Sequence, residues 1–508
     1  MYGKILSIAE LQSIITETRE KDTSVKIVHC HGVFDLLHIG HIRHFKEAKQ
    51  LGDVLIVTLT SDRYVNKGPD RPVFTEQLRS EAIASVEVVD YVVVTEYPTA
   101  VETINILKPD FYVKGKEYAV DSDDLTGKIV DEREAVEAHG GQVVFTDDIV
   151  FSSSILLNRH FSKFPKSTQE FIREFKDQYG VDQVVGAIKS LRDLKVLIVG
   201  ETIIDEYVYC TSLGASSKEP IITVQQTDLD TFAGGALAVA NHVANFSDRV
   251  TVLTMVGDDG KYETLITDKL ADNVEPIFFR KSNTPTIVKR RYVEQYLRQK
   301  LFSVYEINNT PSSDKDNQGL NRLLCEHLAG YDVVIVLDYG HHMIGAEQVK
   351  ILIEESSFLA VNTQSNAGNR GHNTISKYPK ADFVSLASHE IALELRRMDQ
   401  DFEDMIIQLR ERMEFPHIAV TRGKLGILTY SDQGGLHSTP ALTIQVVDRM
   451  GAGDAVLSIA SLLVKKGYPM DLVGFVGNAA GGFAAATLGH ETSLTPIELQ
   501  KYLVTLLK

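Results

Sequence analysis

The sequence predicts two α/β domains, each built on a parallel sheet. The chain has 508 residues, and single hydrophobic cores stop growing at about 250–300 residues. Short runs of β-branched residues recur, first at 26–28 and again at 195–199, and each leads into a glycine-containing segment. Such runs are typical of buried parallel strands. Helical stretches lie between further runs of this kind, and the alternation predicts parallel sheets.

Local signals place the other elements. Apolar β-branched runs predict strands at 54–59, 91–95, 143–145, 333–337 and 418–420, and helices are expected at 42–50 and 76–86. Ser167 and Glu170 have the spacing of a capping box that opens a helix, and Gly180 can end it. Asp182 is expected to cap a second helix that runs to Leu191. The sequence therefore predicts a domain at 1–160, a helical connector at 161–192 and a domain at 193–508.

Composition narrows the classes of partner. The net charge of −17 argues against nucleic acid and anionic membranes, because both require a broad basic surface. Small phosphates need only a few local cations. The three cysteines, Cys30, Cys210 and Cys325, form no closely spaced pair, which excludes a thiolate zinc site and a disulfide framework. We find no leader pattern and expect the apolar stretch 472–488 to be a buried helix, so the protein is predicted to be cytoplasmic.

A pair of histidines marks the first candidate site. His38 and His41 flank Gly40, after an expected strand and at the start of an expected helix. Free N–H groups and the helix dipole attract phosphate at such a position. Spaced three residues apart, the two rings share one face and can donate hydrogen bonds to phosphoryl oxygens. The alternative is a surface or zinc-binding pair, although no third ligand stands at metal spacing.

The surrounding sequence, HGVFDLLHIGHIRHFKEAKQLGDVLIVTLTSD, resembles the cytidylyltransferase-like nucleotidyltransferase family, as do VKGKEY and SSSI farther along. The resemblance covers almost all of 1–160. It implies a Rossmann-like domain in which a substrate phosphate attacks the α-phosphate of a nucleoside triphosphate and expels pyrophosphate. It also implies that His38 and His41 are catalytic and that Mg²⁺ bridges the triphosphate. The implied nucleotide-binding residues are Gly32, Phe34, Gly40, Arg43, Lys46, Lys114, Ser152, Ser153 and Ser154.

Two features of this half leave alternatives open. Lys67 and Arg71 lie in a loop with Gly and Pro and are candidates for binding the substrate phosphate, or they belong to a solvated charged loop. The segment GHIRHFKEAKQLGD is very like the glycerol-phosphate cytidylyltransferases, but the Arg that those enzymes carry before the Ser motif is absent. ATP and CTP therefore both remain as the nucleotide.

A glycine-rich turn marks the second candidate site. Gly451 and Gly453 allow consecutive N–H groups to point into one concavity at the start of an apolar helix, which makes an anion-binding nest. Asp454 is placed to take a proton from an attacking hydroxyl. The alternative is a tight turn with an aspartate at the helix N-cap.

Several segments of 193–508 resemble the ribokinase-like sugar kinases: GETIID, GGA at 234–236, TRGKLG, GAGD and NAA at 478–480. The resemblance implies transfer of the γ-phosphoryl group of ATP to a sugar hydroxyl, with Asp454 as the base. It implies contacts to the sugar from Asp205, Gly234 and Gly235, and a magnesium-linked role for Glu390. The implied nucleotide and anion-hole residues are Thr421, Gly423, Gly426, Gly451, Ala452, Gly453 and Asn478.

Three positions depart from that family. Ala238 stands where the family has an Asn that contacts the sugar, Ala387 replaces the Asn of its NxxE motif, and Met450 replaces a Thr before GAGD. A lost amide removes hydrogen bonds typically worth about 1 kcal/mol each. The domain is therefore either a kinase for a different substrate or a degenerate domain used for binding or oligomerisation.

The whole chain resembles the bifunctional heptose-phosphate kinase/heptose-1-phosphate adenylyltransferase family, through segments such as DEYVY…SKEP and LGHETSLTPIEL. The kinase comes first in that family, whereas here the transferase leads. We expect a dimeric enzyme that makes a nucleotide-sugar or nucleotide-polyol from a nucleoside triphosphate and a sugar or polyol phosphate. The alternatives are a monofunctional transferase with a CDP-glycerol-like product and a degenerate kinase, and a regulator that binds nucleotide without turnover.

Overall fold

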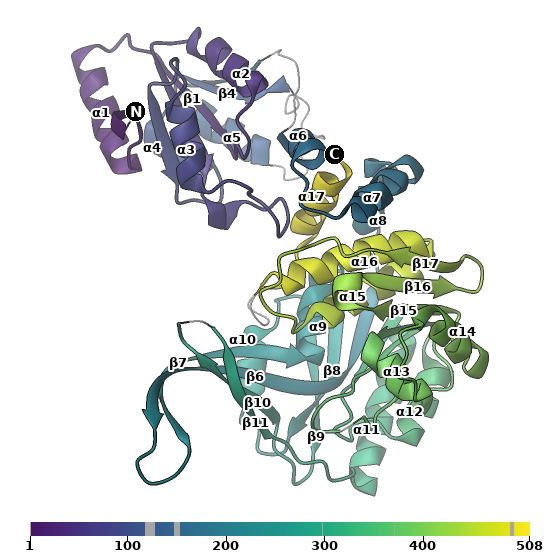
Figure 1. Cartoon of the computed structure of the whole chain (residues 1–508). Helices are drawn as coiled ribbons and strands as arrows, with labels where there is room; N and C mark the ends of the chain where they lie inside the picture. The colour runs from purple at the N-terminus through teal and green to yellow at the C-terminus, as the bar shows by residue number, and fades with distance from the viewer. Residues whose placement is uncertain (1, 117–127, 147–152, 297, 370, 488–491) are drawn as a thin grey trace. The chain divides into compact units, whose positions relative to one another are not determined.

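The structure is a computed structural model, and it describes residues 2–116, 128–146, 153–296, 298–369, 371–487 and 492–508. The chain forms two compact units (Figure 1). The first unit contains residues 1–163 together with 500–508, and the second contains residues 164–499. Both are α/β structures, as the sequence predicts.

The first unit is built on a parallel sheet of five strands in the order β3-β2-β1-β4-β5. The strands are β1 (Ile27–Gly32), β2 (Val54–Thr60), β3 (Tyr91–Thr95), β4 (Phe111–Gly115) and β5 (Gln142–Thr146). The chain order reverses between β1 and β4. Ligands of such sheets bind outside the carboxyl ends of the strands at this reversal, and the segment with the two histidines follows the carboxyl end of β1.

Helices cover this sheet, and their apolar faces form the core with the β-branched strand residues. They are α1 (Ile8–Lys21), α2 (Ile39–Lys49), α3 (Glu76–Ala84), α4 (Val101–Leu107), α5 (Lys128–Glu137) and α6 (Ser153–His160), with short 3₁₀ turns at Tyr2–Lys4 and Asp62–Tyr64. Ser7 and Glu10 form a capping box that starts α1. Core residues such as Val28, Val57 and Val92 are fully buried.

The two connector helices, α7 (Lys166–Gln178) and α8 (Val181–Lys189), are present, but their predicted caps are wrong. Pro165 is the N-cap of α7, so Ser167 lies inside the first turn, and Gly180 caps the start of α8 in place of Asp182. Proline favours the start of a helix because its φ angle already suits that position. Both helices pack within the second unit, where the ring of Phe175 stacks on that of Phe475 with centroids 3.9 Å apart.

The second unit contains a large mixed sheet in which β6 is central. Its main path is β11-β10-β6-β12-β13-β14-β15-β16-β17, with β7, β8 and β9 attached through β6 and β8. The strands are β6 (Lys195–Ala215), β7 (Ile222–Gly235), β8 (Arg249–Gly257), β9 (Val274–Lys281), β10 (Ile287–Glu294), β11 (Lys300–Glu306), β12 (Val333–Asp338), β13 (Leu359–Thr363), β14 (Phe383–Ala387), β15 (His417–Thr421), β16 (Ile427–Ser431) and β17 (Gly435–Thr439).

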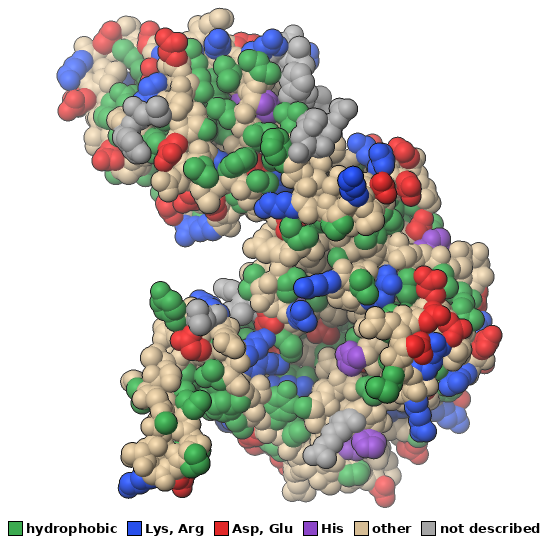
Figure 2. All heavy atoms as spheres, in the orientation of Figure 1, with side chains coloured by type: hydrophobic (Ala, Val, Ile, Leu, Met, Phe, Trp, Pro, Cys, Tyr) green, Lys and Arg blue, Asp and Glu red, His purple; other side chains and the backbone are tan. Residues whose placement is uncertain are grey.

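β6 is much longer than the short strand that the sequence predicts at 195–199. Its first part pairs in parallel with β8 and β12, and its second part pairs with β7 and β10. The β6–β7 arm, residues 210–228, projects from the second unit (Figure 1). Hydrophobic side chains are exposed along this sheet (Figure 2), namely Leu213, Ile221, Ile222, Leu229, Leu301, Phe302 and Val304.

The helices of the second unit include two that are almost entirely apolar. α15 (Ala452–Lys465) and α16 (Met470–Ala485) pack together, and a Cβ at Gly481 would lie 2.7 Å from Val456. The others are α9 (Ala236–Ala244), α10 (Glu263–Lys269), α11 (Asp314–His327), α12 (Ala346–Glu355), α13 (Ser388–Leu395) and α14 (Phe402–Arg412), with 3₁₀ turns at Leu328–Gly330, Ile375–Lys377 and Gly423–Leu425. The last helix, α17 (Pro496–Leu507), begins in the second unit, and its residues from 500 onward belong to the first unit. Within the described ranges no helix is long and apolar enough to cross a membrane.

Candidate active sites

The first site begins at the N-terminus of α2, where His38 is the N-cap residue. The ring of His41, one turn later, stacks on that of His38 with centroids 3.8 Å apart and planes inclined by 22°. The structure thus brings together the two histidines that the sequence singles out. They lie where the helix presents N–H groups without intrahelical partners, which suits an anion.

Burial keeps both rings neutral at pH 7. The pKa of His41 is lowered to about 3, first by burial and then by the charges of His38, His44 and Lys67, against a backbone hydrogen bond with Leu36. Burial also lowers the pKa of His38. Nδ1 of His41 is buried and has no hydrogen-bond partner in the described parts of the chain. The negative charge of a bound polyphosphate would raise the pKa of His41 and favour its protonated form. The protonated ring donates hydrogen bonds from both nitrogens.

Phe34 supports this arrangement. Its φ angle is +49°, a left-handed conformation that is unusual outside glycine, and its ring covers Gly32 so closely that a Cβ there would lie 3.0 Å away. The same ring meets His41 edge-on, with centroids 5.1 Å apart. Phe34 therefore packs over Gly32 on one side and contacts the ring of His41 on the other.

The other predicted nucleotide contacts differ in their positions. Ser153 Oγ donates to the Leu36 carbonyl at 3.1 Å, which places the start of α6 beside the loop that leads to His38. Ser154 is buried, and Ser152 lies outside the described residues. Gly40 is half-buried in the first turn of α2, whereas Arg43 and Lys46 are exposed on that helix.

Lys114, at the end of β4, has a buried partner that sequence reasoning missed. Its Nζ lies 2.9 Å from Glu132 Oε2 on α5, and both side chains are largely buried. After burial, the charge of Lys114 is the next cause of the low pKa of His44, which is about 4. His44 Nδ1 lies 2.8 Å from Thr146 Oγ1. Lys114 therefore belongs to a network beside the histidine pair, and a nucleotide would meet it already paired with Glu132.

Arg71 is not part of a solvated loop. Its guanidinium forms an ion pair with Asp35 at 3.2 Å, and the two side chains are 10% and 2% exposed. Asp35 Oδ1 also accepts hydrogen bonds from the backbone N–H groups of Val73 and Phe74, at 2.7 and 3.1 Å. Asp35 stands within the HGVFD segment, but nothing in the sequence indicates that it holds the distant loop.

Lys67, four residues before Arg71, makes no hydrogen bond or ion pair with the described residues. Its pKa is lowered to about 8, first by burial and also by the charges of Lys508, Arg71 and Arg79, while the charge of Asp35 opposes the shift. Arg79 itself is fully engaged, because it donates to three backbone carbonyls and to Asp62. Lys67 is therefore the cation of this loop that is best able to meet an incoming anion.

The second site lies at the start of α15. Gly451 is its N-cap residue, with a φ of +78°, and open space surrounds the Cβ position of Gly453. Ala452 is the first helical residue, so the N–H groups of this turn lack intrahelical partners. The glycine-rich turn is thus a helix start with room for an anion.

Asp454 lies in the first turn of α15 and is half-buried. Its Oδ1 is 3.5 Å from the hydroxyl oxygen of Tyr339. Lys289 on β10 is a further charged group near this site, and no motif in the sequence marks it. Burial lowers the pKa of Lys289, and the negative charges of Asp205 and Asp454 oppose that shift. Lys289 and Tyr339 thus bring a cation and a hydroxyl to the electrostatic environment of the candidate base.

Of the three residues expected to contact the sugar, Gly234 lies beside Asp205, and Gly235 lies next to Glu201 and Ile203. A Cβ at Gly234 would lie 2.2 Å from Asp205 Oδ2, so only glycine permits this approach, and Gly235 starts α9 with a φ of +63°. The sequence does not reveal that Asp205 forms a buried ion pair with Arg291 on β10. A sugar hydroxyl would therefore meet a carboxylate that already has a cationic partner.

Residues 193–497 match the family model described as pfkB family carbohydrate kinase. The chain belongs to this family. Residues 29–159 match the cytidylyltransferase-like family, so the chain carries the domains of a carbohydrate kinase and of a nucleotidyltransferase, as both resemblances predicted. The structure of phosphofructokinase-2 from Escherichia coli in complex with potassium covers 62% of this chain and 99% of that chain, with a TM-score of 0.50 and 13% identity, which shows the kinase fold.

The curated relatives match the transferase region. The bifunctional protein HldE of Syntrophotalea carbinolica is 37% identical over 147 residues, which are 28% of this chain and 28% of that protein. The HldE protein of Helicobacter pylori is 38% identical over 151 residues, or 27% of this chain and 32% of that protein. Each match thus spans about a third or less of the relative's length.

Ala387, which replaces the Asn of the family's NxxE motif, still contacts Glu390 through its backbone N–H. Glu390 accepts hydrogen bonds from the N–H groups of Ala387 and Ser365, at 2.7 and 3.1 Å. The pKa of Glu390 is raised to about 7, first by burial and also by the charge of Asp454, against the two backbone hydrogen bonds. Magnesium beside nucleotides is held by one or two carboxylates with phosphate oxygens and water. The mutual repulsion of Glu390 and Asp454 fits such a cation, although no three His, Cys, Asp or Glu side chains cluster at metal spacing in the described residues.

The residues that the sequence predicts for nucleotide binding in the kinase domain lie at the end of β15 and after it. Thr421 ends this strand, and Gly423 and Gly426 have φ angles of +54° and +81°. Gly426 is also required by space, because a Cβ there would lie 2.0 Å from the Thr439 carbonyl oxygen. Asn478 Nδ2 donates to the Pro440 carbonyl at 2.6 Å. Asn478 thereby ties α16 to the segment after β17.

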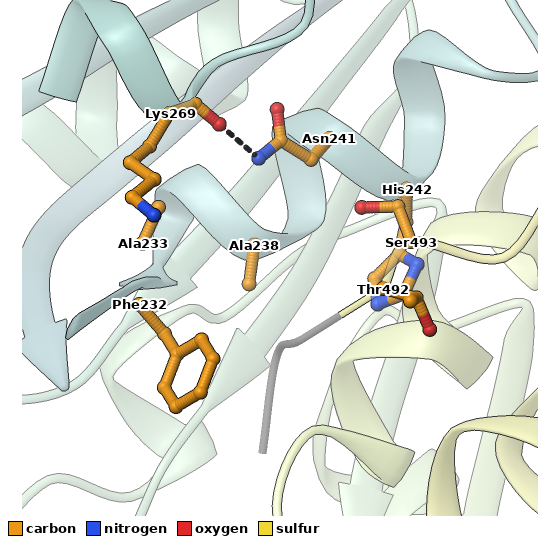
Figure 3. Close-up of a pocket in the computed structure, with 8 residues that line it drawn as sticks. All are labelled: Phe232, Ala233, Ala238, Asn241, His242, Lys269, Thr492 and Ser493. Atoms are coloured by element: carbon orange, nitrogen blue, oxygen red, sulfur yellow. Dashed lines mark hydrogen bonds between the residues drawn. The ribbon is translucent and has the colours of Figure 1, made fainter. Parts of the chain in front are cut away.

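Ala238, the departure at the sugar side, lines a cavity of about 300 Å³ (Figure 3). Asn241, one turn later on α9, donates to the backbone carbonyl of Lys269 at 2.9 Å. The other lining residues are Phe232, Ala233, His242, Thr492 and Ser493. The small side chain at 238 therefore coincides with open volume.

Proposed function

We propose that the chain is a bifunctional enzyme of nucleotide-sugar or nucleotide-polyol synthesis. Its kinase domain phosphorylates a sugar or polyol with ATP, and its transferase domain joins a nucleotidyl group to a sugar or polyol phosphate and releases pyrophosphate. The observation that carries this proposal is the stacked, half-buried pair His38–His41 at the start of α2, at the reversal of strand order. The family matches and the HldE relatives support it.

In the transferase reaction, an oxygen of the acceptor phosphate forms a bond to the α-phosphorus, and the bond to the bridging oxygen of pyrophosphate breaks. The nucleophile is already an anion, so no base is needed. His41 and His38 donate to phosphoryl oxygens, and Lys67 faces the acceptor phosphate. Mg²⁺, when bound with the nucleotide, neutralises phosphate charge. The chain contributes mainly position and fixed donors.

In the kinase reaction, Asp454 accepts the proton of the attacking sugar hydroxyl as its oxygen bonds to the γ-phosphorus, and ADP leaves. The N–H groups at 451–453 hold the transferred phosphoryl group. Lys289 and Tyr339 set the charge around Asp454. Glu390 is the residue proposed to contact magnesium, directly or through water.

The substrates proposed are ATP or CTP in the transferase site and an NDP-heptose-like or NDP-polyol product. Because HldE relatives match this region, a heptose phosphate is the first acceptor to test. We propose a dimer, since the apolar side chains exposed on the β6–β7 arm and β11 would be covered by a second copy. A cytoplasmic location fits the supply of nucleoside triphosphates and the free cysteines.

The function is tested by measuring pyrophosphate release from ATP, CTP, GTP and UTP with a panel of sugar and polyol phosphates. We expect one nucleotide and one acceptor class to give turnover that depends on both substrates. The same preparation is assayed for ADP formation with free and phosphorylated sugars. Absence of pyrophosphate release with every combination would contradict the transferase proposal.

A second candidate function is a monofunctional transferase with a degenerate kinase domain. The buried ion pair of Asp205 with Arg291 and the small Ala238 favour it, because both withdraw polar contacts from the sugar. It predicts pyrophosphate release without ADP formation from any sugar. ADP formation that depends on an added sugar would exclude it.

The pKa of Lys67, about 8, predicts a pH dependence of acceptor binding. Raising the pH from 7 to 9 removes the proton from most Lys67 side chains, while a phosphate monoester, with a second pKa of about 6, stays a dianion. We expect the KM for the acceptor to rise about fivefold or more and the KM for the nucleotide to change little. Lys67→Arg should abolish the rise, since guanidinium stays charged. The same rise in Lys67→Arg would exclude Lys67 as its cause.

A further inference from the structure

The last residues of the chain lie against the loop that carries Lys67. Residues 500–508, the end of α17, cluster with the first unit. Lys501 Nζ donates to Asn66 Oδ1 at 2.9 Å. The ring of Tyr502, which is 3% exposed, stands so close to Gly68 that a Cβ there would lie 2.2 Å from it. The two residues that flank Lys67 are therefore both held by α17.

A third attachment reaches Arg71 through Asn158. Asn158 Nδ2 donates to the Thr505 carbonyl on α17 at 2.6 Å, and its Oδ1 accepts from Arg71 at 2.8 Å. Arg71 in turn pairs with Asp35 in the segment between β1 and α2. One hydrogen-bonded path thus runs from α17 to the segment that precedes His38. Asn158 uses both ends of its amide, which specifies one orientation.

The charges around Lys67 are unbalanced. Of the groups that shift its pKa most, Lys508, Arg71 and Arg79 are cations and Asp35 is an anion, and a second carboxylate of the same loop, Asp70, acts on Tyr502. Asp35 is already committed to Arg71, and Arg79 to Asp62. Asp35 and Asp62 are thus both already paired with arginines, so a bound dianion would lower the repulsion between Lys67 and the neighbouring cations. Lys508, at the end of α17, contributes to this excess.

We propose that residues 501–508 form part of the acceptor-phosphate site of the transferase, with Tyr502 and Lys501 as positioning residues for Lys67 and with Lys508 as an additional cation. The ligand class is a phosphate monoester dianion. This inference rests on the proposed transferase function. Without the ring of Tyr502, the backbone at Gly68 has no wall behind it, so Lys67 would sample many positions and the acceptor would bind weakly.

Steady-state pyrophosphate release tests this role with Tyr502→Ala, Tyr502→Phe and Lys508→Ala. We expect Tyr502→Ala to raise the KM for the acceptor about tenfold, with the KM for the nucleotide within about twofold. Tyr502→Phe keeps the ring and should restore the wild-type KM, and Lys508→Ala should raise the acceptor KM about threefold. Tyr468→Ala in the second unit, whose hydroxyl lies 3.0 Å from Ser190 Oγ, is the matched control. Equal changes in both KM values, or none, would overturn the proposal.

Hydrogen–deuterium exchange separates this inference from the transferase proposal. Saturating inorganic phosphate should slow amide exchange at 64–74 in the full-length protein, and should slow it much less in Tyr502→Ala and Lys508→Ala. This result would support the phosphate site even if no acceptor gave turnover. If phosphate leaves exchange at 64–74 unchanged in the wild-type protein, or protects all three proteins equally, residues 501–508 are not part of a phosphate site.

Discussion

Replacing His41 by alanine is expected to lower pyrophosphate release by about two to three orders of magnitude, while ADP formation by the kinase domain stays unchanged. Removing one preorganised donor to a developing oxyanion typically costs this much. The ring of His41 is held in place by stacking on His38 and by an edge contact with Phe34. The measurement is kcat for pyrophosphate release beside ADP formation in the same preparation.

His139→Ala is the matched control for this variant. His139 is exposed in the same unit, where its Nε2 lies 3.0 Å from Asn105 Oδ1, and it should keep wild-type rates. Because the two stacked rings act on one triphosphate, His38→Ala combined with His41→Ala should cost less than the sum of the single effects in free energy. If His41→Ala releases pyrophosphate at nearly the wild-type rate, His41 is not catalytic, and the alternative of a surface pair of histidines is favoured.

Asp454→Asn is expected to reduce ADP formation by about two to four orders of magnitude, the usual contribution of a general base. The amide keeps the shape of the side chain at the start of α15 but cannot accept the proton of a sugar hydroxyl. The fall should appear in kcat with a smaller change in the KM for the sugar. Pyrophosphate release from the transferase domain should stay at the wild-type rate.

Asp432→Asn provides the comparison for Asp454→Asn. Asp432 pairs with Arg410 at the surface of the same unit, where such pairs are worth about 0–1 kcal/mol, so its loss should leave ADP formation unchanged. If Asp454→Asn retains sugar-dependent ADP formation at the wild-type rate, Asp454 is not the base and has only a structural role in the turn at the start of α15.

The sequence patterns whose predictions the structure confirms are local ones. Alternating β-branched runs and helices predict the strands of both units, since these patterns depend on residues a few positions apart. The spacing of His38 and His41 places both rings on the first turn of α2, and the glycines at 451 and 453 predict a helix start with room for an anion. The predicted capping box at Ser167 failed because Pro165 starts the helix two residues earlier.

The sequence by itself therefore determined the two α/β domains, the family of each and the helix starts at which the two candidate sites lie. Only the tertiary structure decided which side chains are already engaged: Arg71 with Asp35, Lys114 with Glu132 and Asp205 with Arg291. It also brought the end of α17 to the Lys67 loop, through a hydrogen bond between residues 435 positions apart. Such contacts follow from how the whole chain packs, and no local pattern of residue types encodes them.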